Sequence, residues 1–124
     1  MLQGDLINEM EQLSTELDQA LSEQEQRGRN LADCEAAYQV ILRQKALIEK
    51  DSGTPDTFIS QFIRGDREIA EKRRERDIAE ALYQTAKDRV VGIRLKLKIV
   101  DAQAGREWSA IGDGDYPSPP DFTQ

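Results

Sequence analysis

The residues best suited to bind an anion are six basic side chains crowded into one stretch near the middle of the chain. They are Arg64, Arg67, Lys72, Arg73, Arg74 and Arg76. Such a cluster could attract a nucleotide or a nucleic acid through its charge. Five acids are interleaved with it: Asp66, Glu68, Glu71, Glu75 and Asp77. Since many opposite charges are three or four residues apart, they can pair along one helix. We favour a solvated, salt-bridged face and keep Arg64, Arg67, Lys72, Arg73 and Arg76 as a candidate anion contact.

Other patterns that carry chemistry are weak. The chain has no histidine, which removes histidine acid-base catalysis, Ser-His and Cys-His pairs and most zinc sites. Its one cysteine, Cys34, is interpreted as a small buried hydrophobe. Asp113 and Asp115 hint at calcium but lack the remaining ligands of an EF-hand loop, and Arg64-Gly65-Asp66 is interpreted as a helix stop and cap. We therefore predict a protein that is not an enzyme, with no catalytic residue, no cofactor and no metal ligand.

Two long stretches carry apolar residues at alternating steps of three and four. The first contains Leu6, Met10, Leu13, Leu17, Ala20, Leu31, Cys34, Tyr38, Ile41 and Ile48. The second contains Ile69, Ala79, Tyr83, Ala86, Val90, Ile93, Leu97, Val100 and Ala104, with the basic residues Lys72 and Arg76 at two positions of the same heptad pattern. Sustained heptad spacing with polar flanks is typical of helices in coiled coils or long bundles. We expect a bend or a close contact at Gly28, the weak point of the first helix.

The connection between these stretches has its own signals. Gly53 can take a positive φ and end the first helix. Thr54 is predicted to cap a short helix whose first residue is Pro55. Gly65 then ends that helix, and Asp66 is placed to cap the next one.

These patterns predict an all-α fold, a long antiparallel helical hairpin of coiled-coil type with a short capping helix at the turn. We expect helices at about 5–50, 55–64 and 66–104, one domain over 1–108, and a flexible, disordered, acidic Pro/Gly tail over 109–124. Residues 1–26 carry seven acids and no Lys or Arg, whereas residues 78–100 carry a net positive charge. An antiparallel arrangement lays these stretches side by side. Placing Asp51 level with Asp66 predicts the pairs Leu17 with Val100, Ala20 with Leu97, Leu31 with Ala86, Cys34 with Tyr83, and Ile48 with Ile69.

The apolar stripes are too wide for two helices to cover. Since long exposed apolar patches are rare on monomers, we expect a homodimer or higher homo-oligomer, or a bound partner protein. The residues predicted for an oligomer or partner interface are Leu13, Leu17, Leu21, Phe58, Phe62, Ile78, Leu82, Leu95, Ile99 and Trp108. In the tail, the Tyr116–Pro120 run and Phe122 offer a polyproline-type ligand, although a flexible tail is the simpler interpretation.

Composition narrows the setting. The net charge of −7 argues against a protein that coats nucleic acid, and no apolar run is long enough to cross a membrane. The first residues lack the pattern of a secretory signal, and a lone cysteine suits a reducing compartment. We expect the cytoplasm of a host bacterium.

Several short sequence motifs along the chain resemble motifs of a known group of proteins. They are Gly53-Thr54-Pro55, Ile63-Arg64-Gly65, Arg76-Asp77-Ile78-Ala79-Glu80, Tyr83 and Arg106-Glu107-Trp108. Over roughly residues 31–108 the chain resembles small helical accessory proteins encoded by bacteriophages and prophages. The resemblance implies an intracellular phage protein encoded near replication and recombination functions, and it supplies no binding residues.

The leading hypothesis is a non-enzymatic phage-type accessory protein that self-associates and binds another macromolecule. One alternative is a small acidic inhibitor of a bacterial defence effector, of the anti-CRISPR kind, in which carboxylates take the place of phosphates. That alternative requires that the acids of residues 1–26 are not neutralised by the basic residues Lys87 to Lys98. A third hypothesis is nucleic-acid or nucleotide binding through the basic cluster of residues 64–76.

Overall fold

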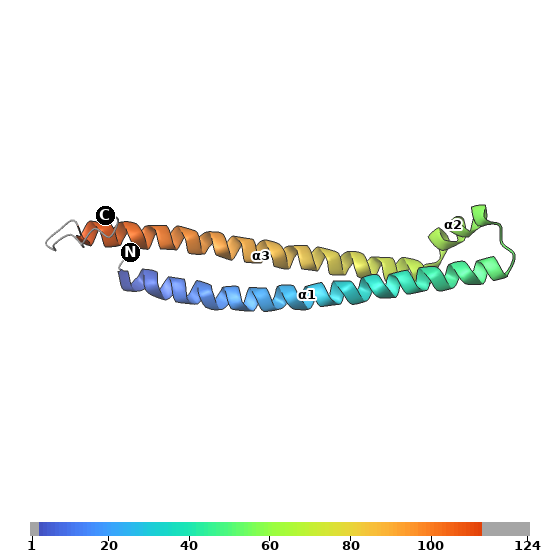
Figure 1. Ribbon diagram of the computed structural model, residues 1–124, viewed down its shortest axis with the longest axis horizontal. Helices are drawn as coiled ribbons and strands as arrows, with labels where there is room; N and C mark the ends of the chain where they lie inside the picture. Colours follow the sequence, from blue (N-terminus) through green and yellow to red (C-terminus); the bar gives the residue numbers. More distant parts are fainter. Residues whose placement is uncertain (1–2, 113–124) are drawn as a thin grey trace, which may run out of the picture. The chain divides into compact units, whose positions relative to one another are not determined.

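Over the residues that the structure describes, α-helix is the only regular secondary structure, and short connections at residues 52–55 and at Asp66 separate the helices (Figure 1). This computed structural model describes the backbone of residues 3–112 and the side chains of residues 4–110. Three α-helices follow one another: α1 (Gln3–Asp51), α2 (Asp56–Gly65) and α3 (Arg67–Gly112). The all-α fold class predicted from the sequence is therefore confirmed.

The described residues form two units, and both long helices contribute a segment to each. Unit 1 combines residues 3–20 of α1 with residues 89–112 of α3. Unit 2 contains residues 21–88, which comprise the remainder of both long helices and all of α2. Each unit has its own buried side chains.

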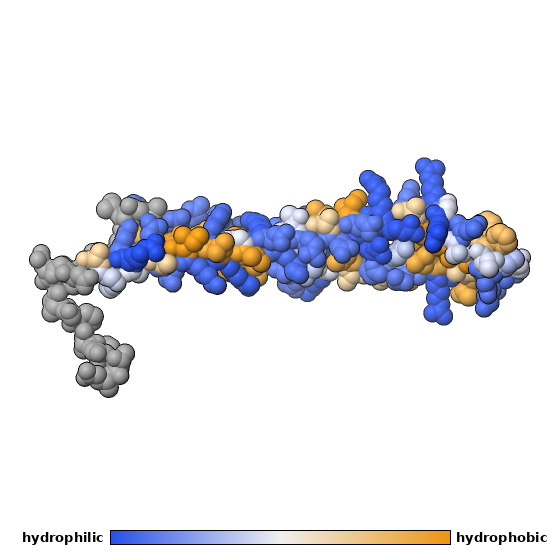
Figure 2. All heavy atoms as spheres, turned by 90° about the horizontal axis from the view of Figure 1, so that it is seen from above, coloured by the Kyte–Doolittle hydropathy of each residue, from blue (hydrophilic) through white to orange (hydrophobic). Residues whose placement is uncertain are grey.

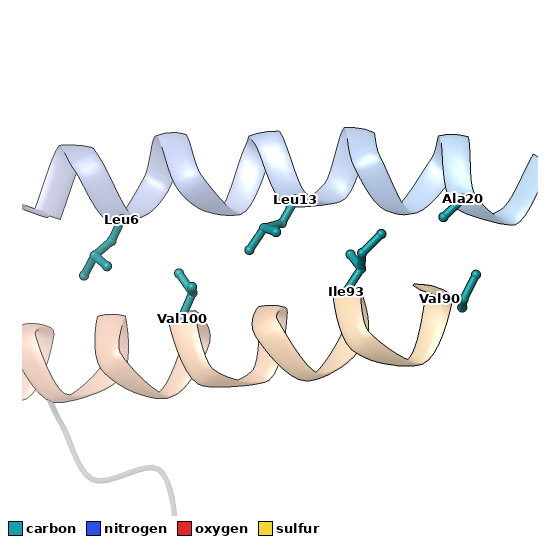
Figure 3. Close-up of a cluster of buried hydrophobic side chains, with 6 residues drawn as sticks. All are labelled: Leu6, Leu13, Ala20, Val90, Ile93 and Val100. Atoms are coloured by element: carbon teal, nitrogen blue, oxygen red, sulfur yellow. The ribbon is translucent and has the colours of Figure 1, made fainter. Parts of the chain in front are cut away.

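The core of unit 1 is built from the two heptad stripes. Its buried side chains are Leu6, Leu13 and Ala20 from α1, and Val90, Ile93 and Val100 from α3. Met10, Leu17, Leu97 and Ala104 pack against them and are partly buried. The two segments run in opposite directions, because Val100 lies between Leu6 and Leu13 while Ile93 lies between Leu13 and Ala20 (Figure 3). Complete burial of a side chain such as Leu6 contributes about 1.5–3 kcal/mol.

Unit 2 has a smaller core. Its buried side chains are Tyr38, Ile69, Ala79 and Ala86, and Ile69 is fully buried. A Cβ atom added to Gly28 would lie 3.2 Å from Cε2 of Tyr83, so α1 carries a close contact at this glycine. The close contact expected at Gly28 is thus present. All buried hydrophobic residues of the two units fall on the predicted heptad stripes.

The pairing register differs from the predicted one. Val100 lies opposite the stretch between Leu6 and Leu13 (Figure 3), where the prediction set it level with Leu17. Tyr83 contacts Gly28, where the prediction set it against Cys34. The shift is about six residues along α1, close to one heptad. A heptad stripe repeats every seven residues, so a slide of about one heptad preserves the apolar match and the pattern cannot select the register.

The end of α1 gives the structural reason for this shift. Lys45 pairs with Asp66 at 3.3 Å, so Asp66 is level with Lys45 and the predicted match of Asp51 with Asp66 is wrong. The turns of α1 after Lys45 continue past the first residue of α3. Leu47 and Ile48, which lie on those turns, are accordingly half exposed or more, and the predicted pairing of Ile48 with the buried Ile69 does not form.

The connection between α1 and α2 confirms one signal and corrects another. Gly53 has a φ of +81°, as expected of a glycine that ends a helix. Thr54 does not cap α2: its hydroxyl donates to the Glu49 carboxylate at 2.9 Å, and α2 begins at Asp56 after Pro55, without a side-chain cap. The backbone carbonyl of Pro55 accepts from the N–H groups of Phe58 and Ile59, which are the first helical hydrogen bonds of α2.

Both ends of α3 are informative. Asp66 caps its start, because its Oδ1 accepts from the backbone N–H of Ile69 at 3.0 Å. The predicted end at Ala104 is wrong, since α3 continues through Gly105 to Gly112. Glycine inside a helix costs about 1 kcal/mol, and the helix-compatible residues after Gly105 keep the backbone helical. Residues 109–112 were expected in the tail but are helical, and residues 113–124 lie outside the described residues.

Candidate functional site

Two of the predicted anion-binding arginines contact an aromatic ring within the protein. The guanidinium of Arg76 lies 4.5 Å from the centroid of the Tyr38 ring, and that of Arg73 lies 5.8 Å from it. Arg73 also donates from Nε to the Tyr38 hydroxyl at 3.3 Å. Cation–π contacts of this kind stabilise a partly desolvated arginine. The buried Tyr38 thus joins α1 to α3 inside unit 2.

Carboxylates complete the environment of these arginines. Arg76 lies 3.6 Å from Glu35 and 2.9 Å from Asp77, which raises the pKa of its guanidinium, chiefly through the Asp77 hydrogen bond. Lys72 pairs with Glu75 at 3.4 Å along α3. Lys72, Arg73 and Arg76 are therefore engaged inside unit 2, as expected for a salt-bridged face.

A second charged group joins the start of α3 to α1. Lys45 lies 3.3 Å from Asp66 and 3.6 Å from Glu68. The hydrogen bond with Asp66 raises the pKa of Lys45. The backbone N–H of Ile69 is the main cause that lowers the pKa of Asp66, and Lys45 adds to it. Asp66 thus caps α3 and anchors it to α1.

Arg64 and Arg67 are placed differently from the rest of the basic cluster. Both are exposed, and within the described part of the chain neither takes part in an ion pair. Arg67 lines a shallow groove between α2 and the start of α3. The groove is lined by Phe58, Gln61, Phe62, Gly65, Asp66 and Arg67. The structure therefore divides the predicted anion contact into three engaged and two exposed side chains.

Helix α2 is the most openly apolar element. Phe58 and Phe62 are each more than half exposed, and α2 contains no buried residue. Ile59 and Ile63 are partly buried on the neighbouring positions. On the face of the molecule drawn in Figure 2, hydrophobic residues are visible at the end that carries α2. Both phenylalanines belong to the interface predicted from the sequence.

The other predicted interface residues fall into two groups. Leu21, Ile78, Leu82, Leu95, Ile99 and Trp108 are exposed. Leu13 is instead buried in the core of unit 1, and Leu17 packs against that core. Leu13 therefore offers no exposed contact surface, and Leu17 offers only a partly buried one, because both face α3 of the same chain.

Sequence reasoning missed several exposed apolar side chains. They are Ile7, Val40, Leu47, Ile48 and Val91, of which only Ile48 lay on a predicted stripe. Val91 directly follows the core residue Val90. Its spacing of four residues from Leu95, and of eight from Ile99, was a readable signal for a second apolar row on the same helix.

The acids at the start of α1 in unit 1 form no direct ion pair with the basic stretch of α3 among the residues described. Asp5, Glu9, Glu11, Glu16 and Asp18 take part in no ion pair among the residues described. Further along, Glu23 and Glu25 pair with Arg27 and Arg29 within α1. Lys87, the first residue of the basic stretch of α3, contacts an aromatic ring and lies 5.6 Å from the centroid of Tyr83.

The remaining sites suggested by the sequence add little. Cys34 is partly buried, and its Sγ lies 4.0 Å from Oδ1 of Asn30. Residues 3–112 contain no group of three or more acidic, cysteine or histidine side chains that could hold a metal ion. The calcium pattern at Asp113 and Asp115, and the polyproline-type run with Phe122, lie outside the described residues. No helix that the structure describes is long and apolar enough to cross a membrane.

Comparison with known proteins provides no further guide to the site. No protein-family model, curated protein or solved structure matches the chain. Any function must therefore be argued from the side chains themselves.

Proposed function

We propose that this chain is a non-enzymatic accessory protein that self-associates and acts by binding another macromolecule. The observation that carries the proposal is a row of apolar side chains on α3 that none of the described residues of unit 1 covers. Val91, Leu95 and Ile99 are 63%, 58% and 56% exposed, at a spacing of four residues. Such a row on a helix that already has a buried face is typical of a contact with another helix.

The arrangement of the whole chain is part of this proposal. In each unit an α1 segment packs against an α3 segment, and residues 52–66, which include α2, connect the two long helices. We propose that both units continue one antiparallel hairpin of coiled-coil type, in which α2 is placed at the turn. This arrangement leaves α2 and the apolar row of α3 as separate contact surfaces.

The strength of self-association can be bounded. Burying the exposed parts of three aliphatic side chains contributes on the order of 1 kcal/mol each. Association costs at least about 4 kcal/mol in lost translational and rotational freedom. The row alone is too small to make a tight oligomer, so we expect assembly that depends on protein concentration and requires additional contacts.

The biological setting rests on the resemblance to small helical phage and prophage proteins. Within that setting the chain acts in the cytoplasm of an infected bacterium, on a protein partner. The exposed phenylalanines of α2 are suited to that partner, because aromatic side chains dominate protein interfaces. The apolar row of α3 is then left for self-association.

Sedimentation equilibrium at several concentrations tests the proposal. The weight-average mass should rise above the 14.1 kDa of one chain, and Leu95→Glu should reduce that rise. Lys50→Glu is a matched control because Lys50 is exposed and far along α1 in unit 2. A mass of one chain at every concentration would refute self-association.

A second function is favoured by one observation. The acids at the start of α1 have no ion pairs within unit 1, so their carboxylates are available to take the place of phosphates. This is what the hypothesis of a small acidic inhibitor of a bacterial defence effector requires. In that case the purified protein should block nucleic-acid binding by the effector. Reversing Glu11 and Asp18 to lysine should abolish the block. A nucleic-acid role is less favoured, because Lys72, Arg73 and Arg76 are engaged within unit 2.

A further inference from the structure

The outer face of α3 in unit 1 is apolar and points away from the core. The outer face consists of Val91, Leu95 and Ile99 together with the basic side chains that flank them. The core residues Val90, Ile93, Leu97 and Val100 face α1. At 100° per residue, Leu95 lies about half a turn from the middle of that core-facing stripe. Figure 2 shows hydrophobic residues exposed on the 89–112 part of α3, and α1 of the same chain cannot reach them.

The flanks of the outer face are basic. Arg94 and Lys98 lie on one side of the apolar row, and Lys96 lies on the other. All three are exposed, and none takes part in an ion pair among residues 4–110. No acidic residue occurs between Arg89 and Val100. The face therefore suits a helix that brings carboxylates together with a small apolar side chain.

The start of α1 has the complementary character. Glu11 and Asp18 are exposed and seven residues apart, so they lie on one side of the helix about 10 Å from each other. Ile7 is half exposed on the same side. Residues 3–20 contain no lysine or arginine. The apolar row from Val91 to Ile99 spans about 12 Å, a length that matches the acidic pair.

We propose that the outer face of α3 binds the acidic start of α1 from a second copy of this chain. In this contact Ile7 packs on the Val91–Ile99 row, and Glu11 and Asp18 lie beside the flanking basic residues. The inference rests on the self-association proposed above and specifies which surfaces meet. Pairing of two outer faces is disfavoured, because it would bring Arg94, Lys96 and Lys98 of both copies together.

The contact joins two different surfaces, so it is heterologous. Each copy that uses its outer face still carries a free acidic α1, and each copy that uses α1 still carries a free outer face. Heterologous contacts build rings or open chains. Assembly should therefore extend beyond two copies as concentration rises, and it should weaken as salt screens the charges.

Complementary charge reversal tests the proposal. One variant carries Arg94→Glu and Lys98→Glu, and the other carries Glu11→Lys and Asp18→Lys. All four positions are exposed, so both variants should keep the helical circular dichroism of the parent chain. The control variant carries Arg43→Glu and Arg74→Glu, which reverse two exposed arginines of unit 2. Mass is measured by sedimentation equilibrium for each variant alone and for an equimolar mixture.

Each reversed variant alone should lose about tenfold or more in its association constant, because like charges then face each other. The mixture should recover the assembly of the parent chain, since each outer face again meets an α1 of opposite charge. The control should assemble as the parent does. Recovery on mixing is a readout that damaged folding cannot produce.

The other outcomes separate this inference from the proposed function. If the reversed variants assemble as the parent does while Leu95→Glu does not, the outer face is used but its occupant is not α1, and the inference is overturned. If Leu95→Glu also assembles, self-association uses another surface and the inference again fails. If the parent chain is a monomer at every concentration, both the inference and the proposed self-association are wrong.

Discussion

Replacing Gly28 with alanine sets two opposing effects against each other in unit 2. Gly28 lies inside α1, where alanine is favoured over glycine by about 0.8–1.0 kcal/mol. The new Cβ would lie 3.2 Å from Cε2, 3.7 Å from Cδ2 and 3.9 Å from Cζ of Tyr83. Carbon atoms pack best at about 3.5–4.0 Å, so only the Cε2 contact is too close. The Tyr83 ring must move by a few tenths of an ångström.

The size of the net effect follows from how freely that ring moves. Tyr83 is partly exposed and is therefore not locked in a core, although Lys87 covers its ring. We expect Gly28→Ala to raise the free energy of unfolding by less than about 0.5 kcal/mol, since the crowding offsets part of the helix preference. Gly28→Leu should lower it by about 1–3 kcal/mol, because a larger side chain cannot be accommodated by a small shift.

Urea unfolding followed by far-UV circular dichroism measures these differences. Gly92→Ala is the matched control, because Gly92 is also inside a helix and no atom lies within 4 Å of its added Cβ. It should gain the full 0.8–1.0 kcal/mol or so. In a Tyr83→Ala background, Gly28→Ala should gain as much as Gly92→Ala. Equal gains for the two single variants with Tyr83 intact would refute the crowding argument.

Three further perturbations test other parts of the fold. Leu13→Ala should lower the free energy of unfolding by about 2–5 kcal/mol because it opens the buried core of unit 1; a loss no larger than that of the exposed Ile99→Ala in urea unfolding would contradict the assigned core. Gly53→Ala should destabilise the chain by about 1 kcal/mol, since φ is +81° at this position; the same assay would show no loss if the turn could relax. The folded-state pKa of Asp66 lies below its ordinary value of 3.8, so its contribution is present above that pH and is lost as the pH falls through the lower folded value. Asp66→Asn should remove this part of the acid-induced loss of stability. An unchanged pH profile of the free energy of unfolding would rule out the contribution of the Asp66 carboxylate.

The sequence predicted the buried positions well because burial in long helices follows directly from periodicity. Leu6, Leu13, Val90 and Val100 lie on heptad stripes, and each faces the other long helix of unit 1. The register could not be obtained in the same way, because neighbouring steps of a heptad stripe are chemically alike. It is set instead by side-chain pairs that periodicity does not describe, such as Lys45 with Asp66.

The candidate site was only partly predictable for a related reason. Phe58 and Phe62 are exposed because α2 is strongly apolar but too short to bury all of its apolar side chains. Arg73 and Arg76 contact Tyr38, which is 35 positions from Arg73 in the sequence. An interpretation based on neighbouring charges does not take such a distant residue into account. The extension of α3 beyond Gly105 was missed because a single glycine was given more weight than the helix-compatible residues that follow it.

The way α2 is inserted between the long helices has a consequence for how the chain can change. It has no buried residue, a positive-φ glycine precedes it, and the cap at Asp66 restarts the helical backbone after it. The buried cores of both units therefore do not require the particular sequence of α2. Substitutions within these ten residues could create a contact for a new partner, while the two long helices that carry α2 stay the same.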